Sequence, residues 1–243
     1  MFRFKQFSVR QEVSAMKVGT DGVLLGAWAT VLPEDRLALD VGTGTGVIAL
    51  MLAQRMAASA GRLGVAAEGP GRGVAGILGI DIDEAAADEA AANFAASPWA
   101  SRLTSRAVSL QAFVSEREQP EFDSIVSNPP FFSASLKAPD AQRRTARHND
   151  TLPPADLIQA ARRLLSPSGR LSVIYPPEEA RAFVMESESA GLYLSRLTRV
   201  ISVAGQPPKR HLMEFTRTPA QPLFTDLVIG SPEYRSLTGD FYL

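Results

Sequence analysis

Two kinds of segment alternate along most of the chain: short apolar runs, typical of buried strands, and longer helix-favouring stretches. The runs predicted to form strands are 37–41, 77–81, 103–108, 122–127 and 169–175. The stretches predicted to form helices are 20–28, 47–54, 84–96, 154–165 and 178–190, the first of them capped by Thr20 or Asp21. Regular alternation of this kind predicts a parallel sheet with helices on both faces.

The two ends of the chain have a different pattern. Apolar runs at 192–203, 211–216 and 223–229 follow one another with no helix between them, which predicts antiparallel strands. Residues 2–9 predict a short edge strand or hairpin ahead of the main fold. The expected fold class is therefore α/β, with a mostly parallel seven-stranded sheet and an antiparallel C-terminal edge.

Length and charge limit the organisation of the chain. It has 243 residues, of which 45% are hydrophobic, and we expect residues 1–243 to form a single domain. The segment 57–76 is rich in Gly and Ala and contains Pro70, which predicts a loop insertion. The net charge of -1 gives no overall basic excess, so any contact with a nucleic acid must come from local patches.

The composition also excludes several kinds of chemistry. The chain has no cysteine, which excludes disulfides, thiolate metal sites and cysteine nucleophiles. Its two histidines, His148 and His211, make a histidine metal site unfavourable, and we expect no metal. The N-terminus lacks the apolar region of a secretory signal, and no apolar run reaches the ~18 residues that cross a bilayer. We therefore expect a cytoplasmic protein with no membrane contact; the oligomeric state stays open, with a monomer favoured.

A glycine-rich turn, Asp40-Val-Gly42-Thr43-Gly44-Thr-Gly46, lies between the first parallel strand and its helix. Such glycines permit positive φ and close approach of the backbone to a ligand. The turn lacks the Lys-Ser/Thr of a P-loop, and the acidic Asp40 would repel a pyrophosphate. A nucleoside with a sulfonium and an amino-acid end suits it better; the alternative is a tight turn without a ligand.

Asp81 ends the second strand, where an acid accepts hydrogen bonds from ribose hydroxyls in nucleotide-binding folds. Its separation from Gly46 exceeds the usual ~20 residues, and the 57–76 insertion accounts for the excess. The alternative is an aspartate that caps the next helix, a role that Asp83 fills as well or better. We expect Asp81 and its neighbour Ile82 to contact the ligand.

The tetrapeptide Asn128-Pro129-Pro130-Phe131 follows the fourth strand, at the sheet edge where open α/β folds bind ligands. The exocyclic amine of adenine is a poor nucleophile because its lone pair is delocalised into the ring. Two acceptors, the Asn128 side-chain oxygen and the Pro129 carbonyl, can take its two N–H groups and turn the lone pair toward a methyl group. Phe131 or Phe132 offers a face on which a flipped base can stack. Considered alone, the same residues could simply end a strand and fill a core.

In this order the two motifs resemble the amino-group branch of the Rossmann-like class I methyltransferases, which share a glycine turn after strand one and Asn-Pro-Pro-aromatic after strand four. More narrowly, the chain resembles the bacterial tRNA1(Val) (adenine-37-N6)-methyltransferase family. The stretches that carry this likeness are Phe4–Phe7, Met16–Trp28, Arg143–Arg147 and Phe241–Leu243. The resemblance implies S-adenosylmethionine as cofactor and the N6 of an adenine in tRNA, adenine 37 of a valine tRNA, as the methylated group.

The resemblance also implies roles for single residues. The glycine turn would hold the methionine end of the cofactor, Asp81 its ribose, and the N-terminal segment 1–30 would close the pocket. The family often has an acid after the third strand that reads the cofactor's adenine amine, but here Val108-Ser-Leu-Gln111 stands there, so Ser109 or a backbone group must substitute. The residues implied in cofactor binding are Thr20, Asp21, Asp40, Gly42, Thr43, Gly44, Gly46, Asp81, Ile82 and Ser109.

Two basic clusters are candidate contacts for the tRNA. One lies beyond the catalytic tetrapeptide and the other in a late turn; they consist of Arg143, Arg144, Arg147 and His148, and of Lys209 and Arg210. Side chains so placed can neutralise phosphates. The alternative is an ordinary solvated surface.

Three other functions stay open at this point. A protein glutamine N5-methyltransferase shares the Asn-Pro-Pro-aromatic motif but normally has an additional N-terminal helical domain, whereas about thirty residues precede the first strand here. A guanine N2 RNA methyltransferase usually has a duplicated domain. A non-catalytic RNA-binding module with the same fold would bind tRNA and show no affinity for the cofactor.

Overall fold

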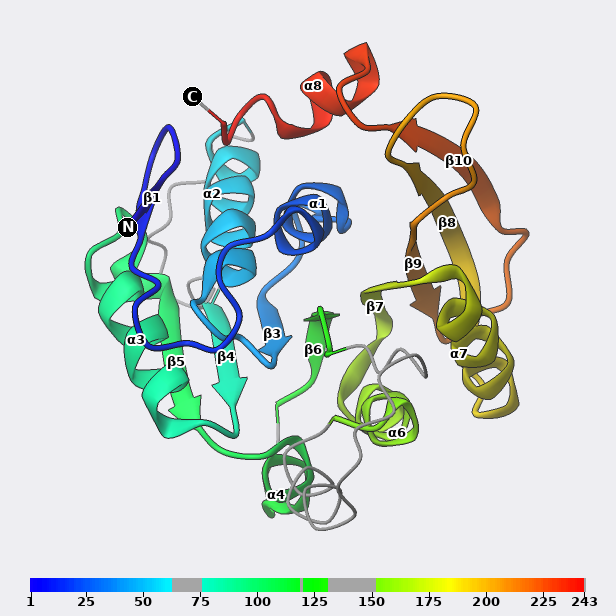
Figure 1. The fold of residues 1–243 in the computed structure, drawn as a ribbon. Coiled ribbons are helices and arrows are strands. Elements are labelled where there is room, and N and C mark those ends of the chain that lie inside the picture. Colours follow the sequence, from blue (N-terminus) through cyan, green and yellow to red (C-terminus); the bar gives the residue numbers. More distant parts are fainter. Residues whose placement is uncertain (63–75, 119, 131–151, 243) are drawn as a thin grey trace, which may run out of the picture.

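The computed structural model describes residues 1–62, 76–118, 120–130 and 152–242, and most of its elements belong to one large sheet (Figure 1). Within these residues the sheet has eight strands in the order β10-β8-β9-β7-β6-β3-β4-β5. In chain order the strands are β3 (Leu37–Val41), β4 (Gly76–Asp81), β5 (Leu103–Ala107), β6 (Phe122–Ser127), β7 (Leu165–Tyr175), β8 (Tyr193–Ile201), β9 (Arg210–Thr216) and β10 (Leu223–Val228). The helices are α1 (Thr20–Trp28), α2 (Val47–Arg62), α3 (Glu84–Ala95), α4 (Leu110–Ser115), α6 (Pro154–Leu164), α7 (Pro177–Ser189) and α8 (Pro232–Thr238), with a 3-10 turn at Ala100–Arg102.

The predicted fold class is confirmed. Strands β3 to β7 pair in parallel, and β9 runs antiparallel to both β7 and β8. The sheet contains eight strands where seven were expected, because β10 pairs in parallel with the outer side of β8. The antiparallel strand is therefore β9, which lies between β8 and β7 inside the sheet. The edge strand β10 is parallel to its neighbour β8.

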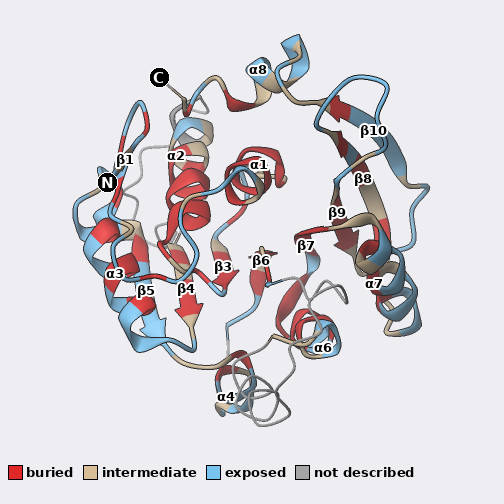
Figure 2. Ribbon diagram, viewed as in Figure 1, coloured by how far each residue is buried: buried red, intermediate tan, exposed pale blue. Residues whose placement is uncertain are grey.

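Side chains alternate between two apolar cores, one on each face of the sheet. Ala38, Val126 and Ile174 pack on the face covered by α1, α2 and α3. Their neighbours Leu39 and Val173 pack on the face covered by α4, α6 and α7. Strands buried on both faces are continuous apolar runs, and this is why the central strands were predictable from sequence (Figure 2).

The largest local difference from expectation concerns the segment 57–76. Residues 57–62 continue α2, which ends at Arg62 and not near residue 54, and Gly76 begins β4. Residues 63–75, the rest of the predicted insertion before Gly76, lie outside the described part of the chain. The alanine-rich sequence at the end of α2 has high helix propensity, which accounts for the longer helix.

Helix ends differ from expectation at α1. Gly19, not Thr20 or Asp21, is the N-cap of this helix, and it contributes no side-chain hydrogen bond to the first turn. Among the described residues no hydrogen bond from a side chain caps the amide groups at this end, and a helix N-terminus of this kind favours anionic groups. The short helices α4 and α8 were not predicted, because six or seven residues are too few to give a clear periodicity.

The N-terminal hairpin is confirmed and is joined to the C-terminus. Strands β1 (Phe2–Arg3) and β2 (Ser8–Val9) pair antiparallel, and the rings of Phe4 and Phe7 stack with centroids 4.5 Å apart. The backbone N–H of Lys5 donates to the carbonyl of Phe241 at 2.9 Å. This contact places the hairpin beside α2 and α3, so that the next residues of the chain run toward the carboxyl ends of the parallel strands (Figure 1).

Candidate active site

The glycine turn after β3 is built from three glycines with positive φ: 70° at Gly42, 53° at Gly44 and 79° at Gly46. A Cβ atom on either of the first two would meet nothing within 4 Å, so their backbone borders open space. A Cβ on Gly46 would lie 2.4 Å from the Cε1 atom of Phe94 on α3. The first two glycines therefore expose backbone to a ligand, whereas the third allows α2 and α3 to pack.

The open space is a cavity of about 640 Å³ along the carboxyl edge of the sheet. Strand order places Asn128 after β6, the glycine turn after β3, Asp81 at the end of β4 and Ser109 beyond β5, all lining this cavity. A smaller cavity of about 330 Å³ lies between the glycine turn and the start of α1, and Met16, Gly42, Gly44 and Asn128 line both. Volumes of this order hold small molecules of nucleoside size.

Asn128 is the polar residue at the junction of the two cavities. Its Oδ1 atom is buried and has no hydrogen-bond partner within the part of the chain that is described. A buried carbonyl oxygen without a donor costs roughly 1 to 3 kcal/mol, so this position favours a ligand that supplies an N–H group. The neighbouring Pro129 is buried and Pro130 is exposed, and both line the main cavity.

Asp81 joins β4 to the glycine turn. One carboxylate oxygen accepts the backbone N–H of Gly44 at 2.9 Å and the other that of Asp83 at 3.0 Å. Each oxygen can accept a further hydrogen bond, which leaves capacity for hydroxyl groups in the cavity. Asp83, not Asp81, caps α3 by accepting from Ala85. Ile82 lies between them and is 52% exposed, an unusual exposure for an apolar side chain that lines a cavity.

Asp40 is fully buried and lies behind the glycine turn. Its Oδ2 atom accepts from the Thr43 hydroxyl at 2.8 Å and from the Ala49 N–H at 3.2 Å. Burial raises the pKa of Asp40 to about 7, against these two hydrogen bonds, and the charge of Asp81 adds to the rise. Neither Asp40 nor Gly46 lines either cavity, so both shape the turn and do not border the open space.

Known proteins resemble this chain along its whole length. The family described as methyltransferase small domain matches residues 22–190. The tRNA1(Val) (adenine(37)-N6)-methyltransferase of Bacteroides fragilis (strain YCH46) is 43% identical, over 100% of this chain and 97% of the relative. The protein of the same name from Flavobacterium johnsoniae is also 43% identical, over 100% of this chain and 99% of the relative. The chain belongs to the tRNA1(Val) (adenine(37)-N6)-methyltransferase family.

Solved structures agree on the fold alone. A predicted O-methyltransferase from Agrobacterium tumefaciens has a TM-score of 0.59 at 16% identity, covering 91% of this chain and 96% of the other. The CcbJ methyltransferase from Streptomyces caelestis has a TM-score of 0.53 at 13% identity, covering 83% and 97%. At these identities the likeness concerns the arrangement of strands and helices.

The cofactor of this methyltransferase is S-adenosylmethionine, as the sequence predicted. The residues present fit it. The main cavity has room for a nucleoside, two glycines without a Cβ border it, and Asp81, which also lines it, has carboxylate oxygens that can each accept one more hydrogen bond. In the described ranges no three His, Cys, Asp or Glu side chains gather to hold a metal ion, and no helix is long and apolar enough to span a membrane.

Thr20 and Asp21 line the smaller cavity, at the start of α1. The Asp21 carboxylate accepts from the Nε of Arg210, the first residue of β9, at 2.7 Å. This contact joins residues 189 positions apart and attaches Arg210 to a residue that lines the smaller cavity. Lys209 beside it is exposed, and its backbone N–H closes the turn on Val200 at 2.8 Å.

Several predicted site residues lie outside the described part of the chain. They are Phe131 of the tetrapeptide and the whole first basic cluster, Arg143, Arg144, Arg147 and His148. Ser109 is described: it caps α4 by accepting from the N–H of Ala112 at 3.1 Å, and it lines the main cavity.

The resemblance implied that the N-terminal segment 1–30 closes the pocket. Within it, residues 12–17 form a strap along both cavities, and sequence reasoning missed how this strap is held. Ser14, Ala15 and Met16 line the main cavity, and Met16 and Lys17 the smaller one. The strap is held by Glu89 of α3, whose carboxylate accepts three consecutive backbone N–H groups and one hydroxyl, those of Glu12, Val13, Ser14 and Ser14 Oγ. A glutamate inside a helix has no local signal for such a role.

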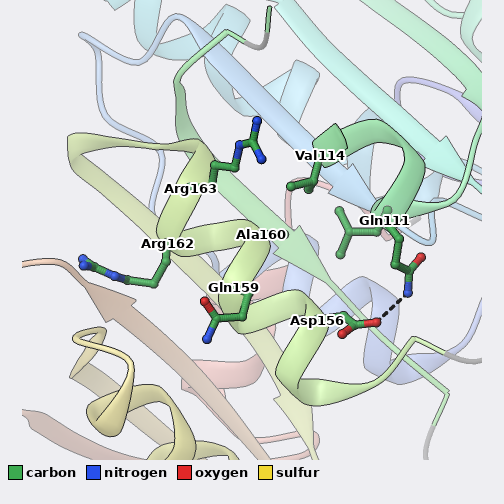
Figure 3. A pocket seen from close by; sticks show the side chains of 8 residues that line it. Gln111, Val114, Asp156, Gln159, Ala160, Arg162 and Arg163 are labelled. Carbon is green, nitrogen blue, oxygen red and sulfur yellow. Dashed lines mark hydrogen bonds between the residues drawn. The ribbon is translucent and has the colours of Figure 1, made fainter. Parts of the chain in front are cut away.

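A third hollow lies between α4 and α6 and is shown in Figure 3. It has a volume of about 520 Å³ and is lined by Leu110, Gln111, Val114, Asp156, Gln159, Ala160, Arg162 and Arg163. Leu110 and Gln111 also line the main cavity, so the two hollows share one wall. Gln111 was not among the predicted site residues.

The two kinds of glycine in the turn predict two different defects. Gly46→Ala places a Cβ against Phe94, and we expect the free energy of unfolding to fall by about 3 kcal/mol. Gly44→Ala meets no protein atom, so its stability loss stays near 1 kcal/mol, while the methyl group in the cavity weakens cofactor binding by about tenfold or more. Urea melts and calorimetry with S-adenosylhomocysteine check the pair. An intact stability of Gly46→Ala combined with lost binding would contradict this assignment.

Proposed function

We propose that this chain transfers a methyl group from S-adenosylmethionine to the N6 amine of an adenine in tRNA, at position 37 of a valine tRNA. The observation that carries the proposal is the Oδ1 atom of Asn128, a buried acceptor without a described partner at the junction of the two cavities. Two relatives named for this reaction align over the full length of the chain, which supports the choice of amine and of RNA.

Asn128 and Pro129 prepare the amine for attack. The Asn128 oxygen accepts one N–H of the amine and the backbone carbonyl of Pro129 accepts the other. This rotates the nitrogen lone pair out of conjugation with the ring and directs it toward the cavity. When bound, the cofactor supplies an electrophilic methyl group on a sulfonium sulfur. As the bond from nitrogen to the methyl carbon forms, the bond between that carbon and the cofactor's sulfur would break, with its electron pair left on sulfur, and the nitrogen would lose one proton to solvent.

Three further parts of the chain hold the cofactor in this proposal. The backbone of the glycine turn contacts the cofactor at Gly42 and Gly44, where no side chain keeps the two apart. Asp81 keeps free acceptor capacity for the ribose hydroxyls. The uncapped amides at the start of α1 suit the carboxylate of the amino-acid end, and the ion pair to Arg210 offsets the charge of Asp21 beside it.

Lys209 is proposed to contact a tRNA phosphate, since it is exposed and comes directly before Arg210 in the chain, which pairs with Asp21 in the lining of the smaller cavity. We expect Lys209→Gln to weaken tRNA binding uniformly and to reduce the slope of log Kd against log salt by about 1. Arg3→Gln is the control, because Arg3 is an exposed cation on the N-terminal hairpin. Anisotropy titrations with a labelled tRNA transcript between about 50 and 200 mM salt measure the slope of log Kd against log salt for each variant. If Lys209→Gln and Arg3→Gln have equal slopes, Lys209 does not contact the RNA.

The proposed function is tested with radiolabelled S-adenosylmethionine offered with an unmodified valine tRNA transcript, bulk tRNA and a glutamine-containing protein substrate. We expect label in the tRNA, and N6-methyladenosine after digestion to nucleosides. N2-methylguanosine in the digest would instead identify a guanine N2 RNA methyltransferase. Label in the protein would identify a protein glutamine N5-methyltransferase. Tight tRNA binding without affinity for S-adenosylhomocysteine would identify a non-catalytic RNA-binding module.

A further inference from the structure

We propose that Gln111, oriented by Asp156, reads the amine edge of the cofactor's adenine. Gln111 lines both the main cavity and the hollow between α4 and α6. Its Nε2 donates to the Oδ2 atom of Asp156, in the first turn of α6, at 2.6 Å. In Figure 3 the amide nitrogen faces Asp156 and the amide oxygen lies on the other side of the group.

The order of the strands places the adenine at this end of the cavity. The inference rests on the proposed function, in which the reacting methyl group lies near Asn128 after β6. From there the edge of the sheet runs through the glycine turn of β3 and Asp81 of β4 to the residues after β5. A nucleoside whose reacting end is at β6 and whose ribose is at β4 has its base beside Ser109 and Gln111.

Asp156 fixes which way the amide points. An ionised carboxylate only accepts hydrogen bonds, so the Gln111 amide must turn its NH₂ group toward Asp156 and its oxygen away from it. A glutamine held in this way presents an acceptor, which suits the N–H of an adenine amine and repels the carbonyl oxygen that hypoxanthine carries at the same position. This arrangement supplies an acceptor where the sequence has no acid, because Val108-Ser-Leu-Gln111 follows β5 directly.

Ser109 complements Gln111. Its Oγ already accepts from the N–H of Ala112, so its hydroxyl proton is available for a ring nitrogen of the base. Together the two residues match the donor and acceptor pattern of adenine: Gln111 accepts from the amine, and Ser109 donates to a ring acceptor.

The test compares binding of two probes by calorimetry: S-adenosylhomocysteine and S-inosylhomocysteine, in which a carbonyl oxygen replaces the amine. We expect the wild type to prefer the adenine probe by roughly tenfold or more. Gln111→Ala binds the adenine probe roughly tenfold more weakly and loses most of the preference. In Asp156→Asn the new amide can either donate or accept a hydrogen bond, so the Gln111 amide can turn over and present its NH₂ group. Because this group can donate to the carbonyl oxygen of the inosine probe, binding of that probe improves. A merely structural role of Asp156 would not produce this gain.

Gln159→Ala is the matched control, because Gln159 lies in the same hollow three residues further along α6 and does not line the main cavity. Its preference should equal that of the wild type. The inference is overturned if the wild type binds both probes equally, or if Gln111→Ala and Asp156→Asn keep the wild-type preference. A wild-type protein that binds neither probe would instead contradict the proposed function itself, and the inference with it.

Discussion

Asn128→Ala is expected to lower kcat for methyl transfer by about 10² to 10³, while the Kd for S-adenosylhomocysteine stays within about twofold of the wild type. The loss falls on kcat because the Asn128 oxygen is proposed to accept from the substrate amine as it becomes a nucleophile. The cofactor is proposed to be held by the glycine turn and Asp81, which the substitution leaves in place. Single-turnover transfer of label to a tRNA transcript measures the rate, and calorimetry the affinity.

Asn128→Asp is the matched variant, because it keeps an acceptor oxygen of the same geometry and adds a charge. We expect an activity between those of Asn128→Ala and the wild type. If Asn128→Ala instead transfers methyl groups at more than about a third of the wild-type rate, a hydrogen bond to the amine is not part of the rate-limiting step.

Glu89→Ala is expected to lower the free energy of unfolding by about 3 kcal/mol and to weaken cofactor binding by about tenfold or more. Glu89 is 8% exposed, and its removal leaves the N–H groups of Glu12, Val13 and Ser14 without their acceptor. The strap that lines both cavities then loses its attachment to α3. Urea melts and calorimetry with S-adenosylhomocysteine measure the two effects.

Asp88 provides the control for this variant, because it is an exposed acid on the same helix, one residue before Glu89. Asp88→Ala should change neither stability nor affinity by more than about 0.5 kcal/mol. A Glu89→Ala protein that binds the cofactor as tightly as Asp88→Ala would show that the strap closes the cavities without this anchor.

The same carboxylate of Glu89 predicts a pH dependence. Burial works against the charge of Glu89, but the hydrogen bonds from Ser14 and from the backbone lower its pKa from the usual 4.5 to about 2. Because the pKa in the folded protein is the lower one, the stabilisation is complete above pH 4.5 and is lost as the pH falls toward 2. Asp40 has the opposite sign: its raised pKa gives a stabilisation that is present below 3.8 and lost as the pH rises through about 7.

Glu89→Gln should therefore flatten the acid side of the stability curve and leave the change near pH 7 intact. Urea melts from about pH 3 to 8 on the wild type and this variant give the comparison. If the free energy of unfolding of Glu89→Gln falls as steeply as that of the wild type between about pH 4.5 and 3, Glu89 is not the group whose protonation destabilises the protein there.

Residues that follow a strand directly were predictable from sequence. The glycine turn, Asp81 and Asn128 each come after an apolar run, and parallel strands bring such positions to one edge. The local motif therefore indicates both the place and the chemistry. Gly42 and Gly46 could not be told apart from sequence, because both are glycines of the same turn. Their roles differ because the side chain of Phe94 lies against Gly46, and this contact is set by the tertiary fold.

Residues that act across long sequence separations were not predictable. Glu89 contacts residues about 75 positions away, and Arg210 contacts Asp21 across 189 positions. The sequence indicated no role for Glu89, and it made Arg210 a candidate tRNA contact without indicating its pairing with Asp21. In both cases the partner is determined by the tertiary fold and not by neighbouring residues. Gln111 was missed for a related reason: its partner Asp156 lies on another helix, 45 positions along the chain.

The most direct test of the central claim is mass spectrometry of valine tRNA from cells that lack the gene, complemented with the wild type or with Asn128→Ala. The account predicts N6-methyladenosine at position 37 with the wild type and its absence with the variant, at equal protein levels. A valine tRNA that carries this methyl group equally in both strains, or in neither, would contradict it.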